Sequence, residues 1–146
     1  MLTTPHSLVG ATIAVLVPNP ALSIPLAIGS HFILDSIPHW QEILYPYKIT
    51  YKTWIRLPID ITLAVFLVNI ISTHSQITAN TVWLTAFAAN IPDFDSIGMI
   101  WKPSLKNKLF KGYYDWHCAI QRETSSFWGV ATQVIISLGS LSISLR

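Results

Sequence analysis

The chain has 146 residues, of which 51% are hydrophobic and only 11% are charged. An average soluble domain carries about 25% charged residues, and the mean hydropathy here is +0.48, so the composition indicates a membrane protein. The formal net charge is only +2, and the single cysteine, Cys118, excludes an intrachain disulfide framework. We also expect no removable signal peptide, because no basic segment precedes an apolar run and a small-residue cleavage site.

Five apolar runs follow one another along the chain. They cover residues 7–17, 21–37, 54–72, 81–91 and about 127–145. The first follows Thr3, Thr4 and Pro5, which is typical of a helix start with a hydroxyl cap and a proline in the first turn. The second should end near Ile37, because Pro38 lacks a backbone donor and clashes with the preceding turn.

The lengths of these runs leave two fold classes to compare. Several are shorter than the roughly 20 residues that cross a bilayer core as a helix, and core helices of a soluble bundle have similar lengths. However, five such runs within 146 residues leave too little polar surface to coat a soluble bundle. The sequence therefore predicts an all-α fold, a single integral membrane domain of about five short helices over residues 1–146, some of which need not span completely.

Basic residues are unevenly shared between the two sides that five alternating helices would define. One side holds the N-terminus and segments 38–56 and 92–122, and the other side holds Arg146. Eight of the nine basic residues lie on the first side: Lys48, Lys52, Arg56, Lys102, Lys106, Lys108, Lys111 and Arg122. The positive-inside rule makes that side cytoplasmic. We therefore expect a protein of the cytoplasmic (inner) membrane with its N-terminus in the cytoplasm.

The segment 101–122 is expected to be a basic, aromatic loop on this cytoplasmic side. Lysines interleaved with Trp, Phe and Tyr resemble a nucleic-acid-binding patch in isolation. Beside a membrane, the same mixture is better suited to anionic lipid head groups. We therefore expect membrane lipids, and no nucleic acid, as partners.

The stretch SHFILDSIPHW, residues 30–40, carries the clearest candidate site. It places His31, Asp35 and His39 at i, i+4 and i+8, so on a helix they would lie one above the other with modest drift. Imidazole and carboxylate are the usual protein ligands of zinc and similar divalent ions. If the helices alternate, His6, Asp60, Asp93 and His117 reach the same membrane depth, and the sequence predicts a metal site there.

Each of these residues also has a simpler interpretation. The histidines could be packing or interfacial residues, and Asp35 could be a helix-end carboxylate that reaches water or pairs with a lysine. Asp60 could favour the dipole at the start of its own helix, orient a metal ligand, or act as a catalytic base. In the NIPDFD segment, residues 90–95, we favour Asp93 as a ligand and leave Asp95 open, since proline followed by aspartate is also typical of turns.

Three motifs resemble a known family in order and spacing. PHSLVGA at residues 5–11, GSHFILDSIPHW at 29–40 and ANIPDFD at 89–95 are similar to motifs of small multi-pass proteins called membrane-bound metal-dependent hydrolases. That family is thought to be distantly similar to zinc-dependent phospholipase C, a helical fold with a His/Asp metal cluster. His117 and Gln121, followed by Trp128, Gly129 and Gln133, resemble the corresponding segment of a bacterial branch.

The resemblance implies a ligand set. It makes five positions metal-binding: His6, His31, Asp35, His39 and Asp93. In the phospholipase pattern the aspartate at the Asp35 position can bridge two metals. This chain lacks the His-Arg-Gly-x-Thr-His segment often found after the PDxD motif, and His117 is the candidate to replace it in part, which leaves the number of metals open.

Together, residues and resemblance predict a metal-dependent hydrolase with its site at the cytoplasmic face. The expected substrate is a phosphoester, with a lipid phosphoester as one option, and the expected cofactor is a divalent ion such as zinc. Asp35 and Asp60 are the catalytic candidates. Two alternatives stay open: a non-enzymatic membrane protein with a structural or transported metal ion or proton, and a membrane scaffold without any metal.

Overall fold

The computed structural model describes residues 1–41, 49–96 and 108–146, and within these ranges every regular element is a helix. The all-α prediction is therefore confirmed for the described part of the chain. Its elements are α1 (Thr3–Leu16), α2 (Pro20–Asp35), α3 (Tyr51–His74), α4 (Ala79–Ala88), the short 3-10 helix η1 (Ile91–Asp93), α6 (Lys108–Ile120) and α7 (Ser126–Ser144).

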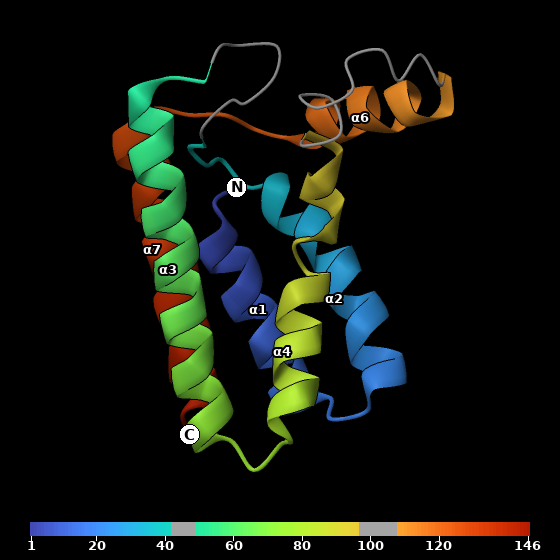
Figure 1. Cartoon of the computed structure of the whole chain (residues 1–146), viewed down its shortest axis with the longest axis vertical. Coiled ribbons are helices and arrows are strands. Elements are labelled where there is room, and N and C mark those ends of the chain that lie inside the picture. The colour runs from blue at the N-terminus through green and yellow to red at the C-terminus, as the bar shows by residue number, and fades with distance from the viewer. Residues whose placement is uncertain (42–48, 97–107) are drawn as a thin grey trace.

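Helix α1 is the centre of the bundle. It packs against α2, α3, α4 and α7, and Figure 1 shows these helices running along the long axis of the molecule while α6 lies across one end. The N-terminus lies toward the α6 end, and the C-terminus lies at the opposite end (Figure 1). Helices α1, α2, α3, α4 and α7 run alternately up and down, and the two termini therefore lie at opposite ends of the bundle.

Small residues allow α1 to approach its neighbours closely. A Cβ added to Gly10 would lie 2.8 Å from the Thr85 carbonyl oxygen and 2.9 Å from the Ala86 Cα, so at this point the backbones of α1 and α4 are nearly in contact. Leu8 and Ala11 of α1 pack beside this contact in the main buried apolar cluster. Close approach through small residues is the usual way in which helices associate in membranes.

Buried hydroxyl groups also connect the helices. Thr12 of α1 hydrogen-bonds to Ser144 of α7 at 2.8 Å, and Ser23 of α2 hydrogen-bonds to Thr85 of α4 at 3.1 Å. These pairs keep polar groups satisfied where no water reaches them.

The outer surface of the bundle is strongly apolar. Ile33, Phe66 and Ile135 each expose 60% or more of their surface, far from what a core residue of a soluble protein would show. Helices α3 and α7 are long and apolar enough to cross a membrane, whereas the apolar helix α2, with 16 residues, is shorter. Among the described helices, length and composition thus allow two to span a membrane, α3 and α7.

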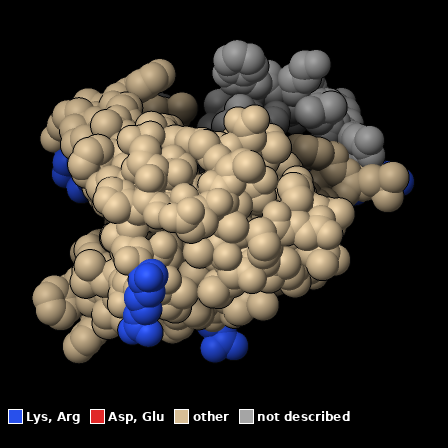
Figure 2. Space-filling model, turned by 90° about the horizontal axis from the view of Figure 1, so that it is seen from below, with Lys and Arg blue, Asp and Glu red and all other residues tan. Residues whose placement is uncertain are grey.

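The end of the bundle opposite α6 carries little charge. Figure 2 views the molecule from that end, and the face consists mainly of uncharged residues, with isolated Lys or Arg and no Asp or Glu in view. The His and Asp side chains that matter below gather near the other end.

Two predicted helix features are wrong. Helix α1 has Leu2 as its N-cap and no side-chain cap of its own, so the Thr3–Thr4 hydroxyl cap does not form. The segment 101–122 is not one loop, because α6 occupies residues 108–120, while 101–107 lie outside the described residues. Alternating charged and aromatic residues obscured this helix, which has a polar and an apolar face.

The segment after α2 is held in place by tertiary contacts. The backbone N–H of His39 donates to the Arg122 carbonyl at 2.9 Å, and the Thr124 N–H donates to the His39 carbonyl at 3.0 Å. Gly129 of α7 lies directly against this segment: an added Cβ would be 2.3 Å from the Trp40 nitrogen and 2.7 Å from the His39 carbonyl carbon. Gln133 of α7 donates to the Trp40 carbonyl at 2.8 Å.

Substitution Gly129→Ala should therefore disturb the bundle. The backbone of His39–Trp40 must move to admit the methyl group, at a cost of about 1–3 kcal/mol, and the thermal midpoint of the detergent-purified protein should fall by several degrees. Gly139→Ala in the same helix is the matched control, since its added Cβ meets nothing within 4 Å. Equal midpoints for the two variants would show that the close contact at Gly129 is unimportant.

Candidate metal centre

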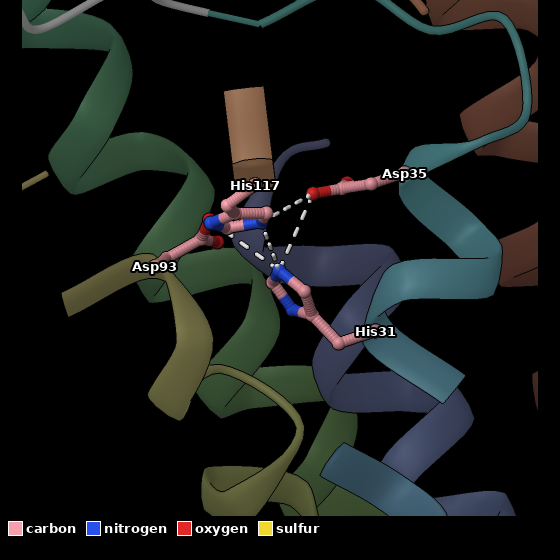
Figure 3. Close-up of side chains that lie close together, drawn as sticks. All are labelled: His31, Asp35, Asp93 and His117. Atoms are coloured by element: carbon pink, nitrogen blue, oxygen red, sulfur yellow. Dashed lines mark hydrogen bonds and ion pairs between the residues drawn. The ribbon is translucent and has the colours of Figure 1, made fainter. Parts of the chain in front are cut away.

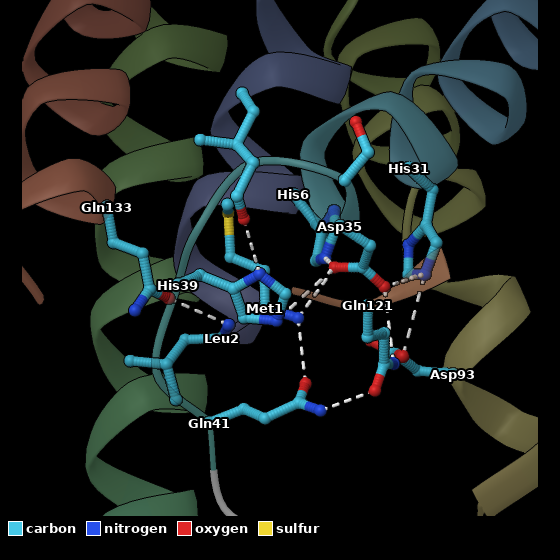
Figure 4. Close-up of polar contacts among 12 residues, drawn as sticks. Met1, Leu2, His6, His31, Asp35, His39, Gln41, Asp93, Gln121 and Gln133 are labelled. Carbon is cyan, nitrogen blue, oxygen red and sulfur yellow. Dashed lines mark hydrogen bonds and ion pairs between the residues drawn. The ribbon is translucent and has the colours of Figure 1, made fainter. Parts of the chain in front are cut away.

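The candidate site is built around the carboxylate of Asp35, the last residue of α2. Its side chain is completely buried, and a buried carboxylate is costly unless it is compensated. Several donor-capable groups from distant parts of the chain surround it (Figure 4). On Oδ1 these are the Met1 amino group at 2.6 Å and His6 Nε2 at 3.2 Å, and on Oδ2 they are His117 Nε2 at 3.1 Å, His31 Nε2 at 3.3 Å and Gln121 Nε2 at 3.4 Å.

Three of the histidines are oriented in the same way. In each ring, Nδ1 faces an acceptor that holds it: Ala89 O at 2.7 Å from His31, Ile37 O at 2.8 Å from His39 and Asp95 Oδ2 at 2.8 Å from His117. Since a carbonyl or carboxylate oxygen can only accept, Nδ1 carries the proton, and in the neutral ring Nε2 is left with a free lone pair. Such anchoring of the distal nitrogen is typical of histidines that bind metals.

The free nitrogens of two of these rings face each other. His31 Nε2 and His117 Nε2 are 3.1 Å apart, and Asp93 Oδ1 lies 3.5 Å from His31 Nε2. Ligand atoms of His31, Asp35, Asp93 and His117 all lie within 4.8 Å of one another, and Figure 3 shows the four side chains pointing toward a common centre. Lone pairs and carboxylates at such distances repel one another unless a proton or a metal ion lies between them.

The pKa shifts at the centre have two causes, burial and hydrogen bonding to carboxylates. Burial disfavours the charged imidazolium of His117, but hydrogen bonds to Asp35 and Asp95 outweigh that effect and raise the pKa of His117 to about 9. Burial raises the pKa of Asp93 and lowers that of His39. Asp35 and Asp95 therefore stabilise positive charge on His117, whereas burial disfavours charge on Asp93 and His39.

His6 and His39 lie on the other side of Asp35. The His6 ring stacks on His31 with centroids 4.0 Å apart, and His39 Nε2 lies 4.0 Å from Asp35 Oδ1. Among the described residues, His6 Nδ1 and His39 Nε2 are buried without a hydrogen-bond partner. The six predicted ligand residues thus lie close together. Four of them share a common centre, namely His31, Asp35, Asp93 and His117. The other two, His6 and His39, lie on the Oδ1 side of Asp35.

Asp60 anchors the start of α1 through its hydrogen bonds to Thr3 and Thr4. It accepts hydrogen bonds from the Thr3 and Thr4 backbone N–H groups at 2.7 and 3.1 Å, and from the Thr4 hydroxyl at 2.6 Å. It therefore caps α1 from α3 and holds the turn that precedes His6. It does not lie in the first turn of its own helix, because α3 begins at Tyr51. These contacts favour an anchoring role, and its catalytic role stays an untested prediction.

Some members of the site were not identified from the sequence. Asp95, which was left open, orients His117. Gln41 accepts from the Met1 amino group at 2.9 Å and donates to Gln121. The only sequence signal for Asp95 was its spacing from Asp93, and no sequence signal indicated Gln41.

A cavity of about 820 Å³ adjoins the centre. Its polar end is lined by Asp93, His117 and Gln121, together with Gln41 and Arg56. Asp93 is the ligand candidate that is not fully buried, with a third of its side chain exposed. A molecule in the cavity would therefore approach the centre from the side of Asp93.

Comparisons with known proteins assign no family to the chain. No family model matches it, and neither the curated proteins nor the solved structures contain a match. The resemblance to membrane-bound metal-dependent hydrolases consequently stays a prediction. The geometry of the site is what supports a function for this chain.

Metal content of the purified protein tests the centre directly. After reconstitution with Zn²⁺ and removal of excess metal, we expect at least one ion per chain by inductively coupled plasma mass spectrometry. His31→Ala and Asp35→Asn should each lower the affinity at least tenfold, because each removes an inward-facing donor. His74→Ala is the control, since His74 is exposed and hydrogen-bonds locally to Ile70. Metal content that is equal in all four proteins would exclude this centre.

Proposed function

We propose that this protein is a membrane-embedded, divalent-metal-dependent hydrolase that acts on phosphoesters. The observation that carries the proposal is the meeting of His31 Nε2, His117 Nε2 and Asp35 Oδ2 at 3.1–3.3 Å from one another. In the neutral rings both nitrogens carry lone pairs, because Nδ1 holds the proton. Three such atoms so close together need a positive charge between them, which a bound metal ion or a proton on one ring can supply.

The donor set fits zinc or a similar ion. Two imidazoles and two carboxylates would hold it: His31, His117, Asp35 and Asp93, with His6 and His39 available on the Oδ1 side of Asp35. A bound ion of this kind supplies Lewis acidity toward a phosphoryl oxygen and lowers the pKa of a bound water toward neutrality. The partly exposed Asp93 leaves one side of the centre open, as catalytic metal sites require.

The residues of this chain contribute position and charge. Asp95 keeps the proton of His117 on Nδ1, and the Ala89 carbonyl does the same for His31. Gln121 and Gln41 lie at the polar end of the cavity, where their amides can orient phosphoryl oxygens. Arg56 lies there too and brings positive charge to an anionic substrate.

We further propose that the site faces the cytoplasm in the inner membrane. Eight of the nine basic residues belong to the N-terminal side or to segments 38–56 and 92–122, and the candidate centre lies near the same end of the bundle as the N-terminus. Reporter fusions test this orientation. A fusion after Arg146 should report a non-cytoplasmic C-terminus, and a cytoplasmic C-terminus would overturn the assignment.

Hydrolysis can be tested with bis(p-nitrophenyl) phosphate and p-nitrophenyl phosphate in detergent. We expect metal-dependent release of p-nitrophenol that a chelator abolishes and that added Zn²⁺ restores. Asp35→Asn should lower kcat/KM at least a hundredfold, because it removes a charged ligand, and His74→Ala should leave it unchanged. A protein that binds metal but hydrolyses neither ester would instead favour a structural or transported ion.

A further inference from the structure

The cavity beside the candidate centre is polar at one end and apolar along the rest. Beyond the polar residues, its walls are formed by one side of α3 and the facing side of α4. The apolar lining on these two helices includes Ile61, Ala64, Val65, Val68, Trp83, Ala86 and Phe87. Between Ile61 and Val68 an α-helix rises by about 10 Å, so the apolar part runs along the bundle for roughly two turns.

Small residues create this space. Ala64 of α3 and Ala86 of α4 both line the cavity, where larger side chains would fill it. On the α1 side, Gly10 lies directly against Thr85 and Ala86, so α4 packs closely on α1. Helix α4 also contacts α3, and the cavity lies where small side chains leave space between these two helices.

The apolar part opens toward the outside of the bundle. Ile61, Val65 and Phe87 line the cavity and still expose 44%, 50% and 57% of their surface. Their neighbours Phe66 and Leu84 are exposed by 60% and 55%. Because α3 is long and apolar enough to span a membrane, this opening would face lipid, and a lipid could enter sideways from the bilayer.

The chemistry of the two ends selects one class of occupant. A peptide would need hydrogen-bond partners for its backbone, which an Ile, Ala and Val wall does not offer. A small polar ester would leave the apolar part unused. A volume of about 820 Å³ lies within the roughly 300–1,000 Å³ typical of small-molecule sites. Asp60, Asp93 and Glu123 also line the cavity, so an anionic head group would need a bound metal ion together with Arg56 to balance them. With that ion in place, an amphiphile with an anionic head and a hydrocarbon chain matches both ends.

We infer that the groove between α3 and α4 binds an acyl chain of a membrane phospholipid, whose phosphate then lies at the polar end beside Asp93, His117 and Arg56. This inference rests on the proposed function for what happens to the phosphate, but binding of the chain does not depend on hydrolysis. It makes the substrate a lipid that enters laterally rather than a water-soluble phosphoester.

A pair of α3 variants tests the groove. Val65→Trp puts an indole into the cavity, whereas Leu63→Trp changes a residue of similar exposure, 46% against 50%, that is not among the cavity-lining residues. Binding of dioleoyl phosphatidylglycerol to the detergent-purified protein is measured by native mass spectrometry. We expect one bound lipid per chain, at least tenfold weaker binding in Val65→Trp and less than twofold change in Leu63→Trp, with equal zinc content in all three proteins.

Equal lipid binding by the two variants would overturn the inference, because the lipid would then be bound only at the outer surface. The proposed function fails separately: if no phosphoester is hydrolysed while lipid binding falls in Val65→Trp alone, the groove stands and the hydrolase does not. Hydrolysis of p-nitrophenyl phosphate, which has no chain, should be unchanged in Leu63→Trp.

A measurement on the unaltered protein covers the case in which Val65→Trp does not fold. One equivalent of a phosphatidylglycerol with a diazirine in its acyl chain is added in detergent and photolysed, and the labelled residues are identified by peptide mass spectrometry. We expect label on α3 and α4 at Ile61, Val65 or Phe87. Label that falls equally on the exposed face of α7, for example at Ile135, would overturn the inference.

Discussion

Burial of the Asp35 carboxylate is the constraint on which the rest of this structure depends. A carboxylate without access to water requires compensation by charge and hydrogen bonds, and here the compensating groups come from the N-terminus, α1, α2, α6 and the segment after α6. Each of these segments must reach the end of α2 at once. The geometry of the site and the packing of the bundle at this end therefore depend on each other. A change that moves any of the segments alters the electrostatics of the centre.

The supporting contacts lie further out and are of three kinds. Asp60 satisfies the first backbone N–H groups of α1 and so sets the position of His6. Gly129 allows α7 to lie on the backbone of His39–Trp40, and Gln133 binds the same segment. Backbone hydrogen bonds between His39 and residues 122 and 124 complete the support. Sites held by such outer contacts keep their ligands in place, because the ligands' own rotamers are restrained.

The bundle combines this polar end with an otherwise apolar surface, and the cavity joins the two. Its polar end meets Asp93 and His117, and its apolar part lies between α3 and α4. The charge of a phosphate and the hydrocarbon of a chain would each find a matching environment along one continuous space. The inferred lipid would need no separate binding domain, since a membrane would itself deliver the apolar part.

Periodicity and composition determined the all-helical fold and most of the candidate ligands, because an apolar run or an i, i+4 spacing acts over one or two turns of the same helix. They also placed the end of α2 near Pro38 correctly. They did not determine that 108–120 is a helix, that Asp60 caps α1, or that Asp95 and Gln41 belong to the site. They also could not separate His6 and His39 from the four residues that share a centre. Those features depend on which atoms of distant segments come within about 3 Å of each other, and only the packing of α1 among its neighbours decides that.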